Sequence, residues 1–380
     1  MRVAMVDPSL FTLPYDAALA RALAFEGCDV TLHARSPREA DGEPGGIDLA
    51  TDFYPFAEAR QMHALPRPLR LAIKGVDHFV SMRRLWRRLR AARPDVIHFQ
   101  WLPLPLLDGR LLGKFRAIAP LVLTVHDTDP FNGSPTAWLQ RLGVRQALQC
   151  FDRLIVHTRQ GQARLLAQGV SAQRTDVLPH GGVPADCQAA DPMQGVLTLL
   201  MFGKIKPYKG VDLLIDAFAA LPLSLRSAAR VRIVGKSYMD LAPLAAQARI
   251  RGVASEISIE PGFVAGDAMQ NLFASGTIAV FPYREIEASG VLFQAIAYGR
   301  PIVASNLGSF AELLRDGVHG RLVPPGNVPA LTQALAALLG DRAHLAACAA
   351  SVRQLAHELP QWADVARGTV QIYTETLRAA

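Results

Sequence analysis

The strongest constraint on the fold is an alternation of short apolar runs with helical patterns that covers the first half of the chain and then starts again. Strands that alternate with helices in this way indicate a parallel sheet, and the restart indicates two of them. We therefore expect an α/β protein with two doubly wound, Rossmann-like domains. The clearest strands are expected at Val3–Val6, Val30–His33, Val96–Phe99, Leu121–Val125 and Leu154–Val156, then at Leu197–Phe202, Arg232–Val234, Ile257–Ile259, Ile278–Phe281 and Ile302–Ala304, with helices such as Asp212–Ala220 and Leu292–Tyr298 between the later ones.

The length of 380 residues, half of them apolar, also suits two domains. A loop rich in Gly and Pro over residues 178–184, followed by a polar stretch to Met193, predicts the hinge. Ligands of open α/β sheets bind outside the carboxyl ends of the strands, so a cleft lined by loops of both domains is expected. The predicted parts are an N-terminal domain at 1–185, a C-terminal domain at 186–360, and a helix at 361–380 that packs back on the first domain.

Cysteine usage and the N-terminus favour a cytoplasmic protein. The four cysteines lie far apart and form no CxxC pair, which argues against a disulfide framework, a zinc ribbon or a redox motif. The start of the chain turns polar at Asp7, before an apolar signal-peptide core could form, and no run of about 18 apolar residues follows. We expect neither secretion nor a membrane-spanning segment.

Positive charge is concentrated in the N-terminal half. The net charge is +7, and residues 1–185 hold 23 Lys and Arg against 17 Asp and Glu, whereas the rest of the chain is nearly balanced. Arginines punctuate an apolar pattern over residues 79–93, which predicts a basic amphipathic helix. Two interpretations stay open: the solvated face of a core helix, or a site for anionic membrane or a polyanionic acceptor. The second would place the protein at the inner face of the membrane. Nucleic-acid binding is not expected, because the segment has no recognised motif.

A lysine cluster stands out because only six of the 40 basic residues are lysines, yet Lys204, Lys206 and Lys209 fall within six positions. The cluster lies between the end of a predicted strand and the start of a predicted helix. A phosphate there would meet ammonium groups, the backbone of Gly203 and Gly210, and a helix N-terminus. Neither a GxGxxG nor a GxxxxGK[ST] pattern occurs here, so a dinucleotide site or a P-loop is not expected. The cluster predicts a diphosphate site of another kind.

A second polar group lies in residues 281–305, which read as strand, loop, helix and strand. Glu285 or Glu287 can accept hydrogen bonds from sugar hydroxyls, and the amides near Gly290 and Val291 begin a helix that can face anionic oxygens. A glutamate before a helix is otherwise often only a dipole partner. We interpret the segment as a candidate partner of the lysine cluster.

Four histidines stand at the ends of predicted strands or in the hinge: His98, His126, His157 and His180. Strand ends that face one cleft are where catalytic residues of α/β proteins lie, although a lone histidine is more often structural. No HExxH or comparable metal-ligand spacing joins them. The loop from Asp7 to Asp16, aromatic and rich in proline, is expected to help bind an acceptor.

Both polar segments resemble the large family of retaining GT-B glycosyltransferases, the family-4-like glycosyl transferases group 1. Residues 202–218 look like the family's donor-phosphate signature, and the resemblance implies that Lys204 and Lys209 hold the diphosphate of a nucleoside-diphosphate sugar, beside Gly203. The resemblance covers residues 196–335 strongly and the N-terminal half weakly.

Residues 281–305 are similar to the family's two-glutamate motif, in which one glutamate meets the transferred sugar and the other meets the ribose. Aligned on the Ala-Tyr-Gly-Arg-Pro end, the motif places Gln294 at the second glutamate position, and the first falls between Glu285 and Glu287. We favour Glu287 because it stands three residues before Gly290, and both stay candidates. The loop carries the Ser-Gly-Val variant, so the implied donor contacts include Ser289, Gly290 and Val291.

The resemblance also implies roles in the first domain. The Thr-x-His-Asp strand end presents His126 to the transferred sugar, and His180 matches a loop that contacts the donor. The implied reaction moves a sugar to an acceptor hydroxyl of a glycan, a glycolipid that can be lipid-linked, or a small molecule. Fixed positive charge then replaces a metal, so no metal and no cofactor is expected; the implied catalytic residues are His126, Lys204, Lys209 and Glu287. The alternatives are a sugar-nucleotide epimerase or hydrolase of the same fold, and a catalytically silent nucleotide-sugar or glycan-binding protein.

Overall fold

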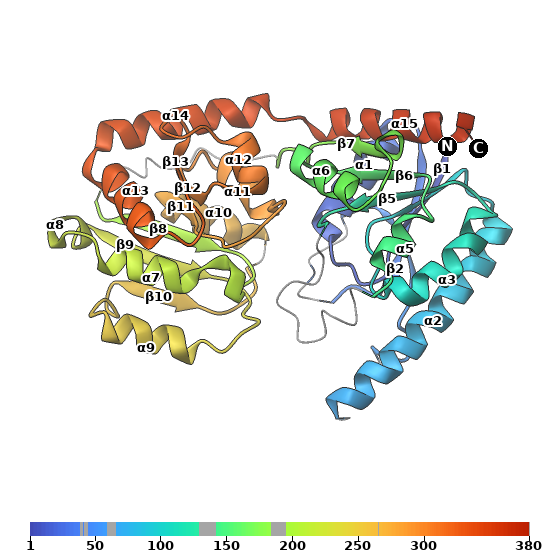
Figure 1. Cartoon of the computed structure of the whole chain (residues 1–380), viewed down its shortest axis with the longest axis horizontal. Coiled ribbons are helices and arrows are strands. Elements are labelled where there is room, and N and C mark those ends of the chain that lie inside the picture. The colour runs from blue at the N-terminus through green and yellow to red at the C-terminus, as the bar shows by residue number, and fades with distance from the viewer. Residues whose placement is uncertain are drawn as a thin grey trace. The chain divides into compact units, whose positions relative to one another are not determined.

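The computed structural model describes residues 1–38, 41, 45–58, 66–128, 142–183, 195–264 and 266–379. The chain forms two compact units, Met1–Gly181 with Pro360–Ala380 and Gly182–Leu359, each of which is described here by itself (Figure 1). The expected boundaries follow residues 185 and 360. The first of these, with most of the predicted hinge, lies outside the described residues.

The first unit is built on seven parallel strands in the order β3-β2-β1-β4-β5-β6-β7. Its strands are β1 (Arg2–Asp7), β2 (Asp29–Arg35), β3 (Asp48–Phe53), β4 (Val96–Phe99), β5 (Leu121–Val125), β6 (Arg153–Val156) and β7 (Thr175–Val177). The central strands are buried on both faces, which is why they read as continuous apolar runs. The order reverses beside β1, and the carboxyl ends of β4 to β7 lie along one edge of the sheet.

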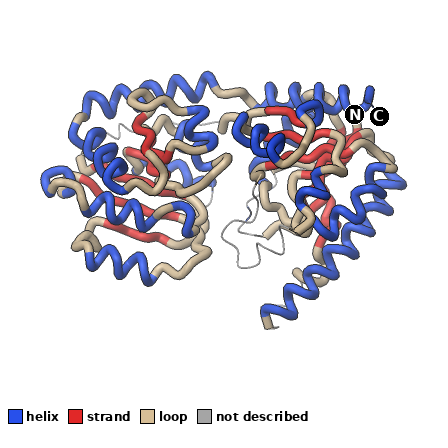
Figure 2. Tube along the Cα trace, in the orientation of Figure 1, coloured by secondary structure: helices blue, strands red, loops and turns tan. Residues whose placement is uncertain are grey.

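Helices cover the sheet of the first unit, and the strands lie between them (Figure 2). They are α1 (Leu13–Phe25), α2 (Arg67–Ala92), α3 (Pro105–Arg116), α5 (Val144–Leu148), α6 (Arg159–Ala167) and α15 (Trp362–Ala379), with a 3-10 turn at Ala172–Arg174. The last helix packs against α1, because Ala366 and Tyr373 are buried in one apolar cluster with Leu19 and Leu23. The C-terminal segment of the chain is thus part of the first unit.

The basic segment at 79–93 lies in α2, a 26-residue helix, and in its C-terminal cap, Arg93. Leu85 and Leu89 are buried in the core of the first unit, whereas all six arginines of the segment are exposed. The helix is therefore amphipathic, with an apolar face that packs inward and a cationic face in solvent.

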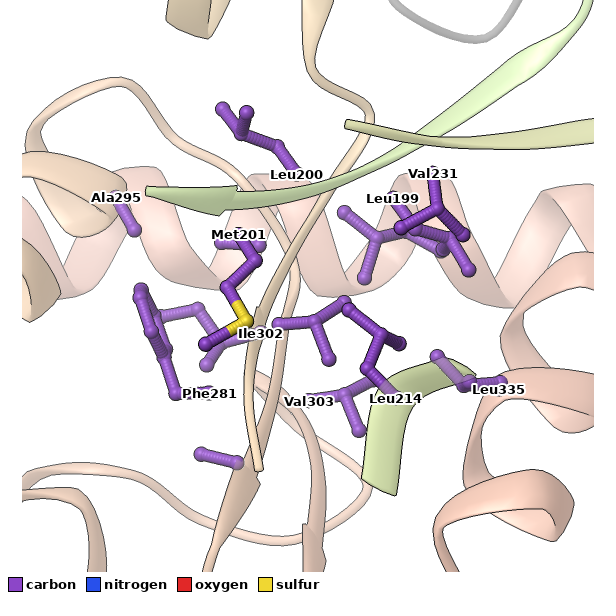
Figure 3. Close-up of a cluster of buried hydrophobic side chains, with 14 of the residues drawn as sticks. Leu199, Leu200, Met201, Leu214, Val231, Phe281, Ala295, Ile302, Val303 and Leu335 are labelled. Carbon is purple, nitrogen blue, oxygen red and sulfur yellow. The ribbon is translucent and has the colours of Figure 1, made fainter. Parts of the chain in front are cut away.

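The second unit is built on six parallel strands in the order β10-β9-β8-β11-β12-β13. Its strands are β8 (Leu197–Phe202), β9 (Ala229–Val234), β10 (Ile257–Glu260), β11 (Ile278–Phe281), β12 (Ile302–Ser305) and β13 (Gly320–Val323). Its helices are α7 (Val211–Ala219), α8 (Leu223–Arg226), α9 (Ala242–Ile250), α10 (Gly266–Ser275), α11 (Gly290–Ala297), α12 (Gly308–Leu313), α13 (Val328–Gly340) and α14 (Arg342–Glu358), with a 3-10 turn at Pro207–Lys209. Side chains of β8, β11 and β12 meet those of the helices in a continuous apolar core, in which Met201, Phe281 and Leu335 are buried (Figure 3).

The prediction of two doubly wound Rossmann-like domains is confirmed, and every strand expected from the sequence is present. Three further strands, β3, β7 and β13, were not expected. β3 carries Asp48, Thr51 and Asp52 and is buried only at Phe53, β7 has three residues, and β13 begins with Gly320 and Arg321. Strands at or near the edge of a sheet need fewer apolar residues, so their sequences lack the pattern that marks a buried strand.

No single helix in the described part of the chain has the length and apolar character of a membrane span; only α13 together with Arg342–Ala379, bent by 100°, passes that test as a pair. The cysteines that the structure describes, Cys28, Cys150 and Cys348, are free thiols.

Candidate functional site

The lysine turn, residues 203–210, connects β8 to α7. The amide of Gly203 donates to the carbonyl of Val234 at 3.0 Å, and Gly203 has a φ of +117°, which favours glycine. A Cβ at this position would lie 2.9 Å from Lys209 Nζ and 3.0 Å from Val291 Cγ2. The absence of a side chain at Gly203 therefore lets the Lys209 ammonium and the start of α11 approach the end of β8.

Lys209 is the buried lysine of this turn, with 6% of its surface exposed. Its Nζ lies 4.8 Å from the centre of the Tyr283 ring, and among the described residues it has neither a hydrogen-bond acceptor nor an ion-pair partner. Burial lowers the pKa of Lys209 to about 8, so the side chain is still largely protonated at neutral pH. A buried ammonium without a counter-charge favours the binding of an anion.

The other two lysines of the turn have different surroundings. Lys204 is exposed, whereas the Nζ of Lys206 lies 5.8 Å from the ring centre of Tyr208 and 5.7 Å from that of Tyr238. Cation–π contacts of this kind hold a lysine against aromatic rings. The turn therefore contains one buried ammonium, one exposed ammonium and one that packs on tyrosines.

The acidic loop, residues 282–289, is bonded to the lysine turn. Arg284 donates to both carboxylate oxygens of Asp212, at 2.9 and 2.6 Å, and its Nη1 donates to the carbonyl of Pro207 at 3.1 Å. Its backbone amide donates to the carbonyl of Tyr208 at 2.7 Å. These bonds fix the positions of the two segments relative to each other, so both sequence-predicted groups of the C-terminal half form one site.

The two candidate glutamates differ in burial: Glu285 is exposed, and Glu287 is 3% exposed. The carbonyl of Glu287 accepts from the amide of Ser309 at 2.8 Å, and a Cβ at Gly308 would lie 2.4 Å from the same carbonyl. Close packing on the β12–α12 turn thus buries Glu287. Of the pair, Glu287 is the buried side chain of the acidic loop.

α11 begins at this loop. Ser289 is its N-terminal cap and is buried, Gly290 is exposed, and Val291 and Gln294 are half-buried in the first turns. The amides at the start of a helix carry partial positive charge that suits an anion. The structure therefore brings the predicted residues Gly203, Lys204, Lys209, Glu285, Glu287, Ser289, Gly290, Val291 and Gln294 to one region of the second unit.

The histidines lie at the carboxyl edge of the first sheet. His98 is in β4, His126 follows β5 and His157 follows β6, and these strands are neighbours. The ring of Tyr15 lies against three of the four histidines, with ring-centre distances of 4.8 Å to His126, 5.1 Å to His157 and 5.2 Å to His180. The histidines that the sequence leaves dispersed therefore form one cluster, together with a tyrosine from the start of α1.

Burial keeps these histidines neutral at physiological pH. It lowers the pKa of His98 to about 3, of His157 to about 4 and of His180 to about 3, and it lowers the pKa of His126 well below the usual value. The Nδ1 of His180 donates to the carbonyl of Gly181 at 2.7 Å. Within the described ranges, no three His, Cys, Asp or Glu side chains group as a metal site requires.

A small cavity adjoins His126. It is lined by Gln100, Trp101, Leu123 and Asp127 among others and has a volume of about 50 Å³, room for a few water molecules or a small substituent. Trp101 is stacked on Phe11, with ring centres 4.4 Å apart. The predicted acceptor loop thus supplies an aromatic ring beside the cavity.

Sequence reasoning missed Tyr15 and Gln100. Gln100 directly follows β4, and its amide contacts His126, so its place at a strand end is a signal that could have marked it. Tyr15 carried no such signal beyond its place in the expected acceptor loop.

Comparisons with known proteins identify the family. The glycosyl transferases group 1 model matches residues 197–341, and the Glycosyltransferase Family 4 model matches residues 17–182. A D-inositol 3-phosphate glycosyltransferase of Nocardia farcinica is 30% identical over 315 residues, which cover 74% of this chain and 67% of that protein. The chain belongs to the glycosyl transferases group 1. It is a glycosyltransferase of the GT-B fold.

Two other proteins match this glycosyltransferase over nearly its whole length. A D-inositol 3-phosphate glycosyltransferase of Rhodococcus opacus is 28% identical over 382 residues, or 92% of this chain and 82% of that protein. The crystal structure of Anabaena HepE in complex with UDP and glucose has a TM-score of 0.76 at 17% identity and covers 99% of this chain and 100% of that one. At that identity the likeness concerns the fold alone.

Proposed function

We propose that this glycosyltransferase moves a sugar from a nucleoside-diphosphate sugar to an acceptor hydroxyl, with retention of the anomeric configuration and without a metal. The observation that carries the proposal is the buried ammonium of Lys209, which the described residues leave without a counter-charge, beside Gly203 and the start of α11. A diphosphate at this position would supply the missing negative charge.

In the proposed mechanism, fixed positive charge stabilises the leaving diphosphate. Negative charge grows on the diphosphate as the glycosidic bond breaks, and a charge that is already in place needs no reorganisation. Lys209 supplies this charge from the buried side, Lys204 supplies it from the exposed side, and the amides of Gly290 and Val291 add the helix dipole. The carboxylate of Glu287 is the proposed acceptor for hydroxyls of the transferred sugar.

The names of related proteins suggest the first ligands to test. HepE was solved with UDP and glucose, and several curated relatives are named D-inositol 3-phosphate glycosyltransferases. UDP is therefore the first nucleotide and D-inositol 3-phosphate the first acceptor that we would try.

The proposal is tested by calorimetric titration of UDP, GDP, ADP, CDP and TDP in the presence of EDTA. We expect selective binding of one nucleotide by the wild type and a loss of at least about tenfold in affinity and turnover in Lys204→Ala and in Lys209→Ala. Lys236→Ala is the matched control, because Lys236 is an exposed lysine at the end of the neighbouring strand. Near-normal rates in both Lys204→Ala and Lys209→Ala would refute the assignment.

Product analysis separates transfer from the competing reactions. Donor consumed rapidly without acceptor would indicate an epimerase or a hydrolase instead. An NMR spectrum of the glycoside reports whether the anomeric configuration of the donor is kept, and an inverted product would rule out retention.

We also propose that the protein is cytoplasmic and works at the inner face of the membrane on a lipid-linked acceptor. The support is α2, where exposed Leu69, Leu71 and Val76 lie on the helix that carries the arginines, with exposed Phe56 beneath Arg84. Apolar side chains together with cations favour an anionic bilayer surface. Co-sedimentation with anionic but not neutral liposomes at low salt is expected, and no binding to either would count against the idea.

A further inference from the structure

A continuous series of hydrogen bonds runs through the histidine cluster. It begins at the C-terminal helix α15 and ends at a backbone carbonyl after β7. The contacts are Tyr373 Oη with His98 Nδ1 at 2.6 Å, His98 Nε2 with the Gln100 amide at 3.4 Å, the Gln100 amide with His126 Nε2 at 3.2 Å, His126 Nδ1 with His157 Nε2 at 3.1 Å, and His157 Nδ1 with the Leu178 carbonyl at 3.1 Å.

The His126–His157 pair is the part of this series in which protons can be counted. Three hydrogen bonds involve the two rings: one to Gln100, one between the rings, and one to the carbonyl of Leu178. Each bond needs one proton. The Leu178 carbonyl only accepts, so His157 must donate from Nδ1, and its Nε2 can then only accept if the ring is neutral. His126 must therefore donate from Nδ1.

The amide of Gln100 decides whether the pair is neutral. If its oxygen faces His126, all three protons must come from two rings, and one of the rings must be an imidazolium. If the amide is rotated by 180°, its nitrogen donates to His126 Nε2, and two neutral rings satisfy every bond.

The surroundings favour the neutral solution. Burial lowers the pKa of both His126 and His157, and the remaining rings packed around them, Tyr15 and His180, carry no negative charge that would offset an imidazolium. The hydrogen bonds of the two histidines within the described residues go to neutral groups.

The rotated amide also agrees with the other half of the series. Its oxygen then faces His98, which donates from Nε2 toward this oxygen and toward Thr124 Oγ1 at 2.8 Å, and accepts at Nδ1 from the Tyr373 hydroxyl. Burial raises the pKa of Tyr373, so its hydroxyl keeps the proton that it donates. Every hydrogen bond of the series then has the same direction: the donor lies on the Tyr373 side and the acceptor on the Leu178 side.

We propose that Gln100 and His157 are positioning residues that hold His126 as its Nδ1–H tautomer, with Nε2 as an acceptor. A ligand hydroxyl that takes the place of the Gln100 amide would then donate a hydrogen bond to Nε2 of His126. The identification of this ligand hydroxyl with a hydroxyl of a sugar rests on the proposed function, whereas the assignment of the His126 tautomer does not.

The tautomer is measured directly by long-range ¹H–¹⁵N spectra of the histidine rings in the full-length wild type, without any substrate. His126→Gln and His157→Gln assign the signals among the ten histidines. We expect His126 to be neutral at pH 7, with Nδ1 protonated and Nε2 bare. A proton on Nε2 of His126 at pH 7, on either a neutral or a charged ring, would overturn the proposal.

Gln100→Glu tests the control by Gln100. An ionised carboxylate only accepts, so the pair must take up a proton, and we expect the spectrum to show an imidazolium with kcat lowered about 10- to 100-fold, as for groups that orient a metal-bound histidine. Gln173→Glu, an exposed substitution in the same unit, is the control. Unchanged ring protonation in Gln100→Glu while the ¹³C chemical shift of the introduced carboxyl shows it to be ionised would refute the role of Gln100, whatever happens to the activity; a protonated carboxyl donates to His126 as the amide does, so neutral rings are then the expected result. Failure of the glycosyltransferase proposal would leave the spectra of the wild type unaffected.

Discussion

Replacement of Lys209 by methionine should make the unliganded protein more stable while it weakens nucleotide binding. Burial lowers the pKa of Lys209 from 10.5 to about 8. At about 1.4 kcal/mol for each pKa unit, the buried charge costs about 3 kcal/mol. Loss of the contact with the Tyr283 ring offsets about 1 kcal/mol of this in the variant. We expect Lys209→Met to gain about 2 kcal/mol at pH 7, or about 4–8 °C in Tm for a unit of this size.

The pH dependence gives the sign of the effect. Below the folded pKa of about 8, the lysine is charged in both the folded and the unfolded chain, so the whole cost of burial is present. Between about pH 8 and 10.5 the folded protein loses the proton more readily than the unfolded chain, and the cost disappears. The advantage of Lys209→Met over the wild type should therefore shrink as the pH rises through this window.

Differential scanning calorimetry is the suitable assay, because all four tryptophans lie outside the Gly182–Leu359 unit and their fluorescence would not report its unfolding. Nucleotide at 100 times the wild-type Kd should stabilise the wild type by about 2.7 kcal/mol and the variant by no more than about 1.4 kcal/mol, the value for a tenfold loss of affinity. A variant that is less stable than the wild type at pH 7, or a difference that is the same at pH 7 and pH 10, would refute the idea of an uncompensated buried charge.

Three further outcomes are expected. Glu287→Gln should lower kcat/KM at least about tenfold and Glu285→Gln by less than about threefold, because only Glu287 is buried; steady-state kinetics with saturating acceptor decide between them. Arg284→Ala should raise the KM for the donor, because it releases the acidic loop from Asp212. The free energy of unfolding, measured with denaturant, should change by less than about 1 kcal/mol because the Arg284–Asp212 ion pair is partly exposed. An unchanged KM would contradict a role of this ion pair in donor binding. Addition of EDTA should leave the rate unchanged, and loss of activity that Mg²⁺ restores would disprove metal independence.

The sequence by itself determined the two parallel sheets and the approximate position of the phosphate site. Buried parallel strands need apolar residues on both faces, and this leaves a local pattern in strands such as β8 and β11 that requires no knowledge of the partner strands. The lysine turn was visible for a similar reason: a strand end, a glycine and a helix start are neighbours in the chain, and clustered lysines are conspicuous in a chain that otherwise uses arginine.

Only the tertiary structure decided which residues of each site are buried. Lys204 and Lys209 are alike in sequence, but the start of α11, 82 residues beyond Lys209, closes over one of them next to Gly203. Glu287 is buried because the backbone at Gly308 packs against it, and Gln100 meets His126 because β4 and β5 are neighbours. The charge and the tautomer of each group are set by its burial and its hydrogen-bond partners. Both depend on segments that are distant in the chain, so the local sequence does not encode them.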